Sequence, residues 1–168
     1  MKTKQQKQQA ELVKKQTSNA IKWINALDPS KGFQKTTEQL GKKFSGVEYV
    51  KNIKKDMAYC CLGVACRTME YPNVKFNDGE RPSLVKDLGL FDSVGGFYDD
   101  SNKVYNGFRS YLKIGKEREV SSLVLMNDNG YTNDKDFTRV HKFILKNLKY
   151  IFVPEVAERL KKHYSKKK

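Results

Sequence analysis

Apolar residues recur every three or four positions near the start of the chain, and this spacing predicts an amphipathic helix over residues 10–27. The positions that share its apolar face are Val13, Thr17, Ala20, Ile21, Ile24 and Leu27. The helix should end at Asp28, because Pro29 disfavours helical geometry in the residue before it. We therefore expect one face of this helix to lie on the core.

A continuous stretch of small and apolar residues predicts a second helix, buried on all sides, over residues 60–69. The residues in helical register within it are Leu62, Ala65 and Cys66. Gly63 lies in the interior of this helix, where it weakens helical structure. Its presence there indicates close packing against another part of the backbone.

Shorter elements are expected in the rest of the chain. A strand is predicted where apolar and polar residues alternate, at Val47, Tyr49 and Ile53. Turns are expected at residues 77–79 and 95–96, and mixed strand and loop over 97–112. The later helices expected are one over 82–88 ended by Gly89, one capped by Ser121 or Ser122 and ending near Met126, one over 135–148 capped by Asp134, and one beginning at Pro154. This set of elements predicts an α+β fold with more helix than strand.

The length of 168 residues fits a single domain with its own core. The formal net charge is +14, and much of it lies near the two ends of the chain. Five lysines against one glutamate give residues 1–15 a charge of +4, and residues 161–168 carry +5. We therefore expect one compact domain over residues 11–161, flanked by flexible basic tails at 1–10 and 162–168.

The chain shows no sign of a membrane or secretory segment. No apolar run approaches the roughly 18 residues that a membrane span needs. The basic N-terminal stretch is followed by no apolar region of the kind that marks a secretory signal. We expect a cytoplasmic protein without a membrane partner, in which the three cysteines are reduced thiols.

The basic tails are candidates for contact with nucleic acid, since lysine attracts phosphate irrespective of base sequence. The candidate residues are Lys2, Lys4, Lys7, Lys161, Lys162, Lys166, Lys167 and Lys168. Solvated tails without a partner are the competing interpretation. Lysine outnumbers arginine 27 to 6, which argues against bidentate recognition of bases.

Aromatic residues interspersed with cations form a second possible nucleic-acid surface, because exposed rings can stack on bases. The aromatic residues are Phe97, Tyr98, Tyr105, Phe108 and Tyr111, and the cations are Lys103, Arg109 and Lys113. An aromatic strand of the core, with solvated cations beside it, is the favoured interpretation.

All three cysteines lie in the segment Tyr59-Cys60-Cys61-Leu62-Gly63-Val64-Ala65-Cys66. Cys60 and Cys61 are near the start of the expected helix, whose dipole would stabilise a thiolate, so both are candidate nucleophiles. The candidate base is His141, although it shares an apolar helical stripe with core residues. Packing of the thiols in the core is the competing interpretation. The cysteine spacing does not fit a zinc site, and we predict no metal and no cofactor.

A polar turn, Asn127-Asp128-Asn129-Gly130, lies about sixty residues after the cysteines. Its acidic positions do not fit a calcium-binding EF-hand loop. Asn and Asp bond readily to neighbouring backbone, and glycine accepts positive φ, so a turn that ends a helix is the favoured interpretation. A small ligand bound by Asn127 or Asp128 is the alternative.

The cysteine segment and this turn together resemble a family of small proteins from bacteriophage and prophage genomes, marked by YCCLGVxC and a later L-N-D-x-G. The resemblance covers residues 23–144: Trp23 and Leu27 match a W-x-x-A-L opening, and segments 82–90 and 137–144 match two further elements. Ala65 and Met126 depart from the pattern but remain apolar. The matched positions are chiefly apolar, glycine or turn-forming, so the resemblance implies a shared fold in a phage setting.

The leading hypothesis is a phage accessory protein in the host cytoplasm that acts by binding nucleic acid or a host protein. Two alternatives stay open. One is a cysteine-dependent hydrolase or transferase that uses Cys60 or Cys61, and the other is a small-ligand binder around Asn127 and Asp128. Binding is favoured over catalysis, because the titratable residues do not assemble into a complete catalytic set.

Overall fold

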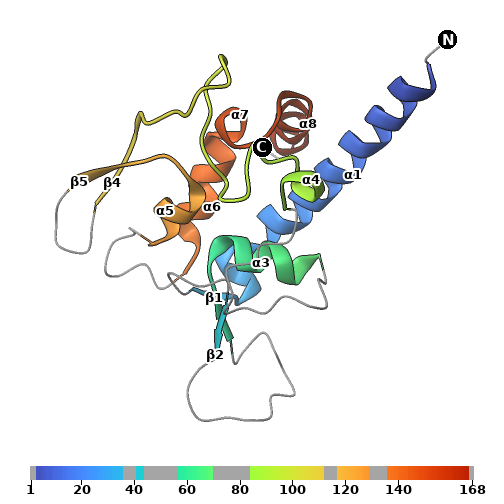
Figure 1. Ribbon diagram of the computed structural model, residues 1–168. Coiled ribbons are helices and arrows are strands. Elements are labelled where there is room, and N and C mark those ends of the chain that lie inside the picture. Colours follow the sequence, from blue (N-terminus) through green and yellow to red (C-terminus); the bar gives the residue numbers. More distant parts are fainter. Residues whose placement is uncertain are drawn as a thin grey trace.

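The computed structural model describes residues 3–35, 41–43, 57–69, 84–111, 117–128 and 136–166 (Figure 1). Its helices are α1 (Lys4–Ala26), α3 (Cys61–Thr68), α4 (Leu84–Leu88), α5 (Leu123–Asp128), α6 (Thr138–Lys146), α7 (Leu148–Ile151) and α8 (Pro154–Ser165), with a 3-10 turn η1 (Pro29–Lys31). Its strands are β1 (Gln34–Lys35), β2 (Gly41–Lys43), β3 (Met57–Tyr59), β4 (Phe108–Tyr111) and β5 (Glu117–Val120). The fold is α+β with more helix than strand, as predicted.

The first helix, α1, begins at Lys4, about six residues before its expected start. A capping box fixes this end: the Thr3 hydroxyl accepts from the backbone N–H of Gln6 at 3.2 Å, and the Gln6 side chain accepts from the N–H of Thr3 at 3.0 Å. Residues 4–10, which the sequence analysis places in a tail, are therefore helical. Figure 1 shows these turns projecting away from the rest of the described chain.

The apolar face of α1 lies on the core, with Ala20, Trp23 and Ile24 completely buried. Helices α3, α4 and α8 pack against it. On α8, the hydroxyl of Tyr164 donates to the side-chain oxygen of Asn25 at 3.1 Å. The buried apolar residues of the described chain form one continuous cluster, which joins α1 to the C-terminal helices.

Two small sheets accompany the helices. In the first, β3 is central, with β1 parallel to it on one side and β2 antiparallel on the other. Strand β3 leads directly into Cys60 and α3, and so places the start of that helix. In the second sheet, β4 pairs with β5, and Phe108 lies opposite Val120. Strand β4 falls within the predicted strand-and-loop region 97–112, whereas the strand predicted around Val47, Tyr49 and Ile53 and the turn at 77–79 lie outside the described residues.

Several predicted helix boundaries are confirmed. Helix α3 matches the predicted buried helix, and α8 begins at Pro154. Gly89 ends α4 with a φ of +67°. Of the two candidate caps for α5, Ser122 is the one used, since its hydroxyl accepts from the N–H of Leu125 at 3.2 Å.

The predicted helix over 135–148 differs from the structure at both ends. Helix α6 begins at Thr138, where the carboxylate of Asp136 accepts from the Thr138 N–H at 2.8 Å, and Asp134 lies outside the described residues. It ends at Lys146, and α7 follows after Asn147. The last helix, α8, continues to Ser165, so residues 162–165 of the expected C-terminal tail are helical.

Among the described residues, none of the helices combines the length and the apolar character that a membrane crossing requires.

Candidate functional site

The cysteine segment forms the beginning of α3, and its thiols take part in the packing there. Cys60 is the N-cap residue, and its sulfur accepts from the backbone N–H of Gly63 at 3.3 Å. Cys61 is the first helical residue, and its thiol donates to the carbonyl oxygen of Leu123 in α5 at 3.6 Å. All three cysteines are buried, with at most 7% of each exposed.

Asn127 supplies a second cap to α3 from a different helix. Its side-chain oxygen accepts from the backbone N–H of Cys61 at 3.2 Å, and its amide nitrogen donates to the Asp128 carboxylate at 3.0 Å. The first N–H groups of a helix have no partner within that helix, so an acceptor from elsewhere satisfies one of them. The Asn127 side chain is completely buried, and its polar atoms are thus committed to the protein interior.

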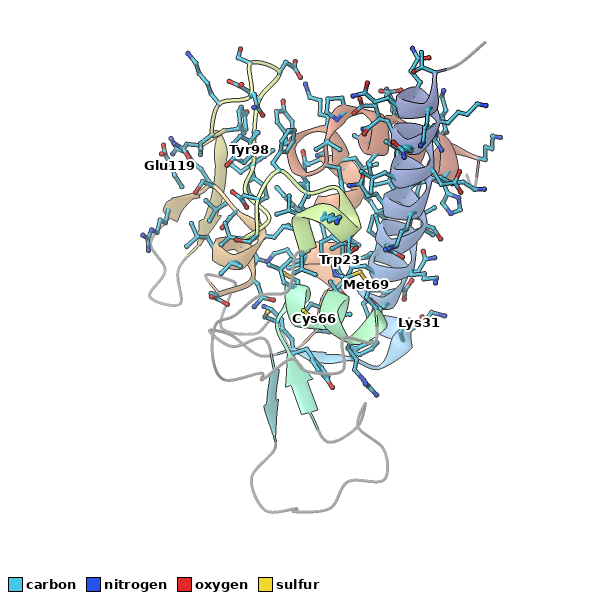
Figure 2. The ribbon with its side chains drawn as sticks, turned by 45° about the vertical axis from the view of Figure 1, so that its right-hand side comes forward. Trp23, Lys31, Cys66, Met69, Tyr98 and Glu119 are labelled. Carbon is cyan, nitrogen blue, oxygen red and sulfur yellow. The ribbon has the colours of Figure 1, made fainter. Side chains whose placement is uncertain are left out.

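Trp23 completes this junction from the side of α1. Its indole N–H donates to the carbonyl oxygen of Cys61 at 2.8 Å. Figure 2 shows Trp23 in the interior, on the side of α1 that faces α3, where Cys66 is also labelled. The N–H, the carbonyl and the thiol of Cys61 are all hydrogen-bonded, to Asn127, Trp23 and Leu123 respectively. Three segments that are far apart in the sequence, around Trp23, Cys61 and Asn127, therefore meet at one residue.

The electrostatics of Cys61 favour the neutral thiol. Burial raises the pKa of Cys61 well above its ordinary value, and the neighbouring Cys60 and Asp128 raise it further. A nucleophilic cysteine needs the opposite environment, partly exposed and positive, in which the thiolate is stabilised. At neutral pH the group is a protonated donor in the core.

His141, the candidate base, lies on α6 and is partly buried. Burial lowers the pKa of His141 below its ordinary value of 6.5, and the charge of Asp28 partly offsets this effect. The charged group that shifts the pKa of His141 is thus Asp28, the N-cap of η1, whereas Cys60 and Asp128 shift the pKa of Cys61. The structure gives the two halves of the proposed catalytic pair different surroundings.

Asn127 and Asp128 occupy the end of α5, where Arg139 also contributes. The guanidinium of Arg139 donates to the carbonyl oxygen of Met126 at 2.7 Å, which ties α6 to this helix end. A ligand of Asn127 would have to displace the bond from Cys61. Within the described ranges, no group of three or more His, Cys, Asp or Glu residues is placed to hold a metal ion.

Of the aromatic residues predicted as a possible stacking surface, Phe97 and Tyr105 both contact Phe108, and Tyr98 packs on Phe91. The side chain of Tyr111 lies outside the described residues. Phe97 is completely buried and lies edge-on to Phe108, with ring centroids 5.2 Å apart. Tyr105 stacks on Tyr150 at 4.6 Å, and the ammonium of Lys149 lies 4.6 Å from the centre of the Tyr150 ring. These rings extend the core toward the β4–β5 sheet, as the favoured interpretation of the sequence expected.

The lysines of α1 lie together on the exposed side of that helix. We call Lys4, Lys7, Lys14, Lys15 and Lys22 the α1 lysine row, and each of them is exposed. Successive helical residues are turned by about 100°, which places the whole row within an arc of about 100°. That arc lies opposite the buried face of Ala20, Trp23 and Ile24, and Glu11 is its one acidic member.

Lys4 and Lys7 of this row are among the nucleic-acid contacts predicted from the sequence, whereas Lys14, Lys15 and Lys22 are not. Their signal was their spacing within the helix predicted over 10–27, and the capping pattern of Thr3 and Gln6 extends that helix to bring Lys4 and Lys7 onto the same arc. Of the other predicted contacts, Lys161, Lys162 and Lys166 are exposed at the end of α8. Lys2, Lys167 and Lys168 lie outside the described residues.

Charge is distributed unevenly over the described chain. Residues 136–166 hold eight basic and three acidic residues, and α1 holds five lysines against one glutamate. The described stretches 84–111 and 117–128, which run from α4 through the β4–β5 sheet to α5, hold four basic and seven acidic residues. Strands β4 and β5 lie on the opposite side of the molecule from α1 (Figure 1). Among the described residues, the excess of basic over acidic residues therefore lies in α1 and in residues 136–166.

Two features thus distinguish the described chain: a buried polar junction at Cys61 and an exposed basic side built on α1. The first fixes core structure, and the second faces solvent. The chain matches no family model, no curated protein and no solved structure.

Proposed function

We propose that the protein acts by binding nucleic acid, through phosphate contacts made by the α1 lysine row and the exposed lysines at the end of α8. The observation that carries this proposal is the alignment of five exposed lysines on one arc of α1. In keeping with the resemblance to phage and prophage proteins, it would serve as a phage accessory protein in the cytoplasm of the infected cell.

The buried junction supports binding rather than catalysis as the class of function. Cys61 is protonated, buried and hydrogen-bonded through every polar group it has. Asn127 is buried and holds the start of α3. These groups stabilise the fold, which leaves the exposed charges as the part of the described chain best suited to meet a partner.

Electrostatic attraction to phosphate gives the proposal a quantitative signature. A protein that neutralises phosphates releases bound counterions, and its affinity falls with salt at a logarithmic slope of about −0.9 per contact on B-form DNA. If each lysine of the row makes one contact, the row alone contributes a slope of about −4.5.

The test compares two triple variants that remove the same charge from opposite sides of the molecule. K4Q/K7Q/K14Q removes three lysines from the row, and K103Q/R109Q/R118Q removes three exposed cations from the less basic stretches. Glutamine keeps the helix propensity of lysine, so α1 should persist. Binding is measured by fluorescence anisotropy with labelled duplex DNA between 50 and 300 mM salt.

We expect the row variant to bind at least tenfold more weakly at 150 mM salt and to lose about 2.7 from the magnitude of the salt slope. The control variant should bind within about threefold of wild type. Equal loss in both variants would show that net charge rather than the row determines affinity. Absence of any binding to DNA or RNA by the wild-type protein at 50 mM salt would overturn the proposal, and so would tighter binding to anionic lipid vesicles.

A further inference from the structure

We infer that the partner is double-stranded nucleic acid, held along its backbone by the α1 lysine row without stacking on bases and without preference for sequence. This inference rests on the proposed function and specifies its substrate class. Three properties of the described residues carry it: the length of the row along one continuous helix, the packing of the aromatic rings on one another, and the uneven distribution of charge.

The row follows the axis of one continuous helix. From Lys4 to Lys22 it extends about 27 Å along the helix axis, at about 1.5 Å per residue. The capping box of Thr3 and Gln6 holds even its first turn in helical form. On duplex DNA this length matches about eight base pairs. A duplex is stiff over this distance, so the row meets its phosphates without having to straighten a flexible strand.

Single-strand binders combine a basic groove with exposed aromatic rings, on which successive bases stack. In the described chain, the rings of the aromatic cluster pack on one another instead. Phe97 is completely buried, Phe108 packs edge-on against Phe143 at 4.8 Å, and Tyr105 and Tyr150 stack on each other. The ammonium of Lys149 lies close to the Tyr150 ring as well. Stacking a base would require these contacts to be broken.

The charge distribution also favours contact from one side. In the described stretches 84–111 and 117–128, which include β4 and β5 across the molecule from α1 (Figure 1), acidic residues outnumber basic ones by seven to four. One of these acidic residues, Asp87 of α4, lies beside the row, with its carboxylate 3.9 Å from the ammonium of Lys15. A flexible strand wrapping around the protein would meet most of these carboxylates, whereas a rigid rod lying on α1 would meet chiefly lysines, since Asp87 is paired with Lys15. Lysine acts toward phosphate as a point charge rather than a bidentate fork, so such contacts carry no direct sequence information.

The experiment measures the affinity of the full chain for four probes of 24 nucleotides or base pairs at 150 mM salt. They are two DNA duplexes of unrelated sequence, one RNA duplex, and single-stranded oligo-dT. We expect both DNA duplexes to bind within threefold of each other and at least tenfold more tightly than oligo-dT. The RNA duplex tests whether DNA and RNA phosphates are bound alike. We expect its affinity to lie within tenfold of that of the DNA duplexes. A larger difference in affinity would overturn recognition through phosphates alone.

The charge-preserving variant K4R/K7R/K14R separates point-charge contact from any specific role of lysine. It should bind duplex DNA within threefold of wild type, while K4Q/K7Q/K14Q should lose at least tenfold. Binding of oligo-dT as tightly as the duplexes would overturn the inference and leave the proposed function standing. A tenfold preference for one duplex sequence would overturn backbone-only recognition. Failure to bind all four probes even at 50 mM salt would overturn the proposed function itself.

Discussion

The side-chain oxygen of Asn127 accepts a hydrogen bond from the backbone N–H of Cys61, across 3.2 Å and 66 residues of sequence. This bond joins the end of α5 to the beginning of α3. The cysteine segment and the Asn-Asp turn, which stand apart in the sequence, are thus two parts of one junction. Both segments are therefore needed to form the junction.

Replacing Asn127 with alanine should lower the free energy of unfolding by about 2–3 kcal/mol, because the buried N–H of Cys61 loses its acceptor and a small cavity forms. Urea unfolding followed by circular dichroism measures the loss. The control is Asn106→Ala, at an exposed position, which should change stability by less than about 0.5 kcal/mol. Equal effects at the two sites would contradict the capping role.

Gly89 and Gly32 offer a matched pair of alanine substitutions, since both have positive φ, +67° and +73°. At Gly32 an added Cβ meets no atom within 4 Å, so Gly32→Ala should cost only the backbone strain of about 1–2 kcal/mol. At Gly89 the Cβ would lie 2.8 Å from Val156, and overpacking should add about 1–3 kcal/mol. Thermal and urea unfolding measure the difference in stability between the two variants. Similar losses of stability would show that α8 shifts to accommodate the added Cβ.

The three thiols should be protected from modification in the folded protein. Burial, together with the raised pKa of Cys61, leaves little reactive thiolate at neutral pH. Labelling with a maleimide, followed by mass spectrometry of peptides, should show modification at the rate of unfolding in buffer and rapid modification of all three in urea. Fast labelling of Cys60 or Cys61 in the native protein would revive the nucleophile hypothesis.

Stability should decrease as the pH falls below about 6.5, through His141. Because burial lowers the pKa of folded His141, the unfolded chain binds a proton first as the pH drops, and protonation favours unfolding. The midpoint of urea unfolding between pH 7.5 and 5 measures this slope. His141→Gln should flatten it, and Asp28→Asn should steepen it, because the charge of Asp28 raises the pKa of His141. An unchanged slope in His141→Gln would assign the effect to other groups.

The sequence predicts best the features that depend on neighbouring residues. The stop at Gly89, the start at Pro154 and the apolar helix after Cys60 each follow from local backbone preferences. The break between α6 and α7 was missed, although its cause is also local. The amide of Asn147 donates to the carbonyl of Phe143 at 2.9 Å and so competes with the helical hydrogen bonds.

Contacts between residues that are far apart in the chain could not be predicted from the sequence. Neither Asn127 nor Cys61 carries a signal that it bonds to the other, and the carbonyl partner of Trp23 is equally hidden. The sequence predicts an excess of positive charge near the two ends of the chain. That Lys4, Lys14 and Lys22 share one arc depends on where α1 begins. Charge counting carries no such geometry.

The packing of α1 against α8 has a consequence for biosynthesis. The Tyr164 hydroxyl bonds to Asn25, 139 residues before it, so α1 is synthesised well before the helix α8 that packs on it. At about 5–20 residues per second, roughly 7 to 28 s separate the two. During that interval the apolar side of the nascent helix lacks the cover that α8 gives it, and the lysines on its other side keep it hydrated. The charges that we propose to meet nucleic acid would then first protect the growing chain from aggregation.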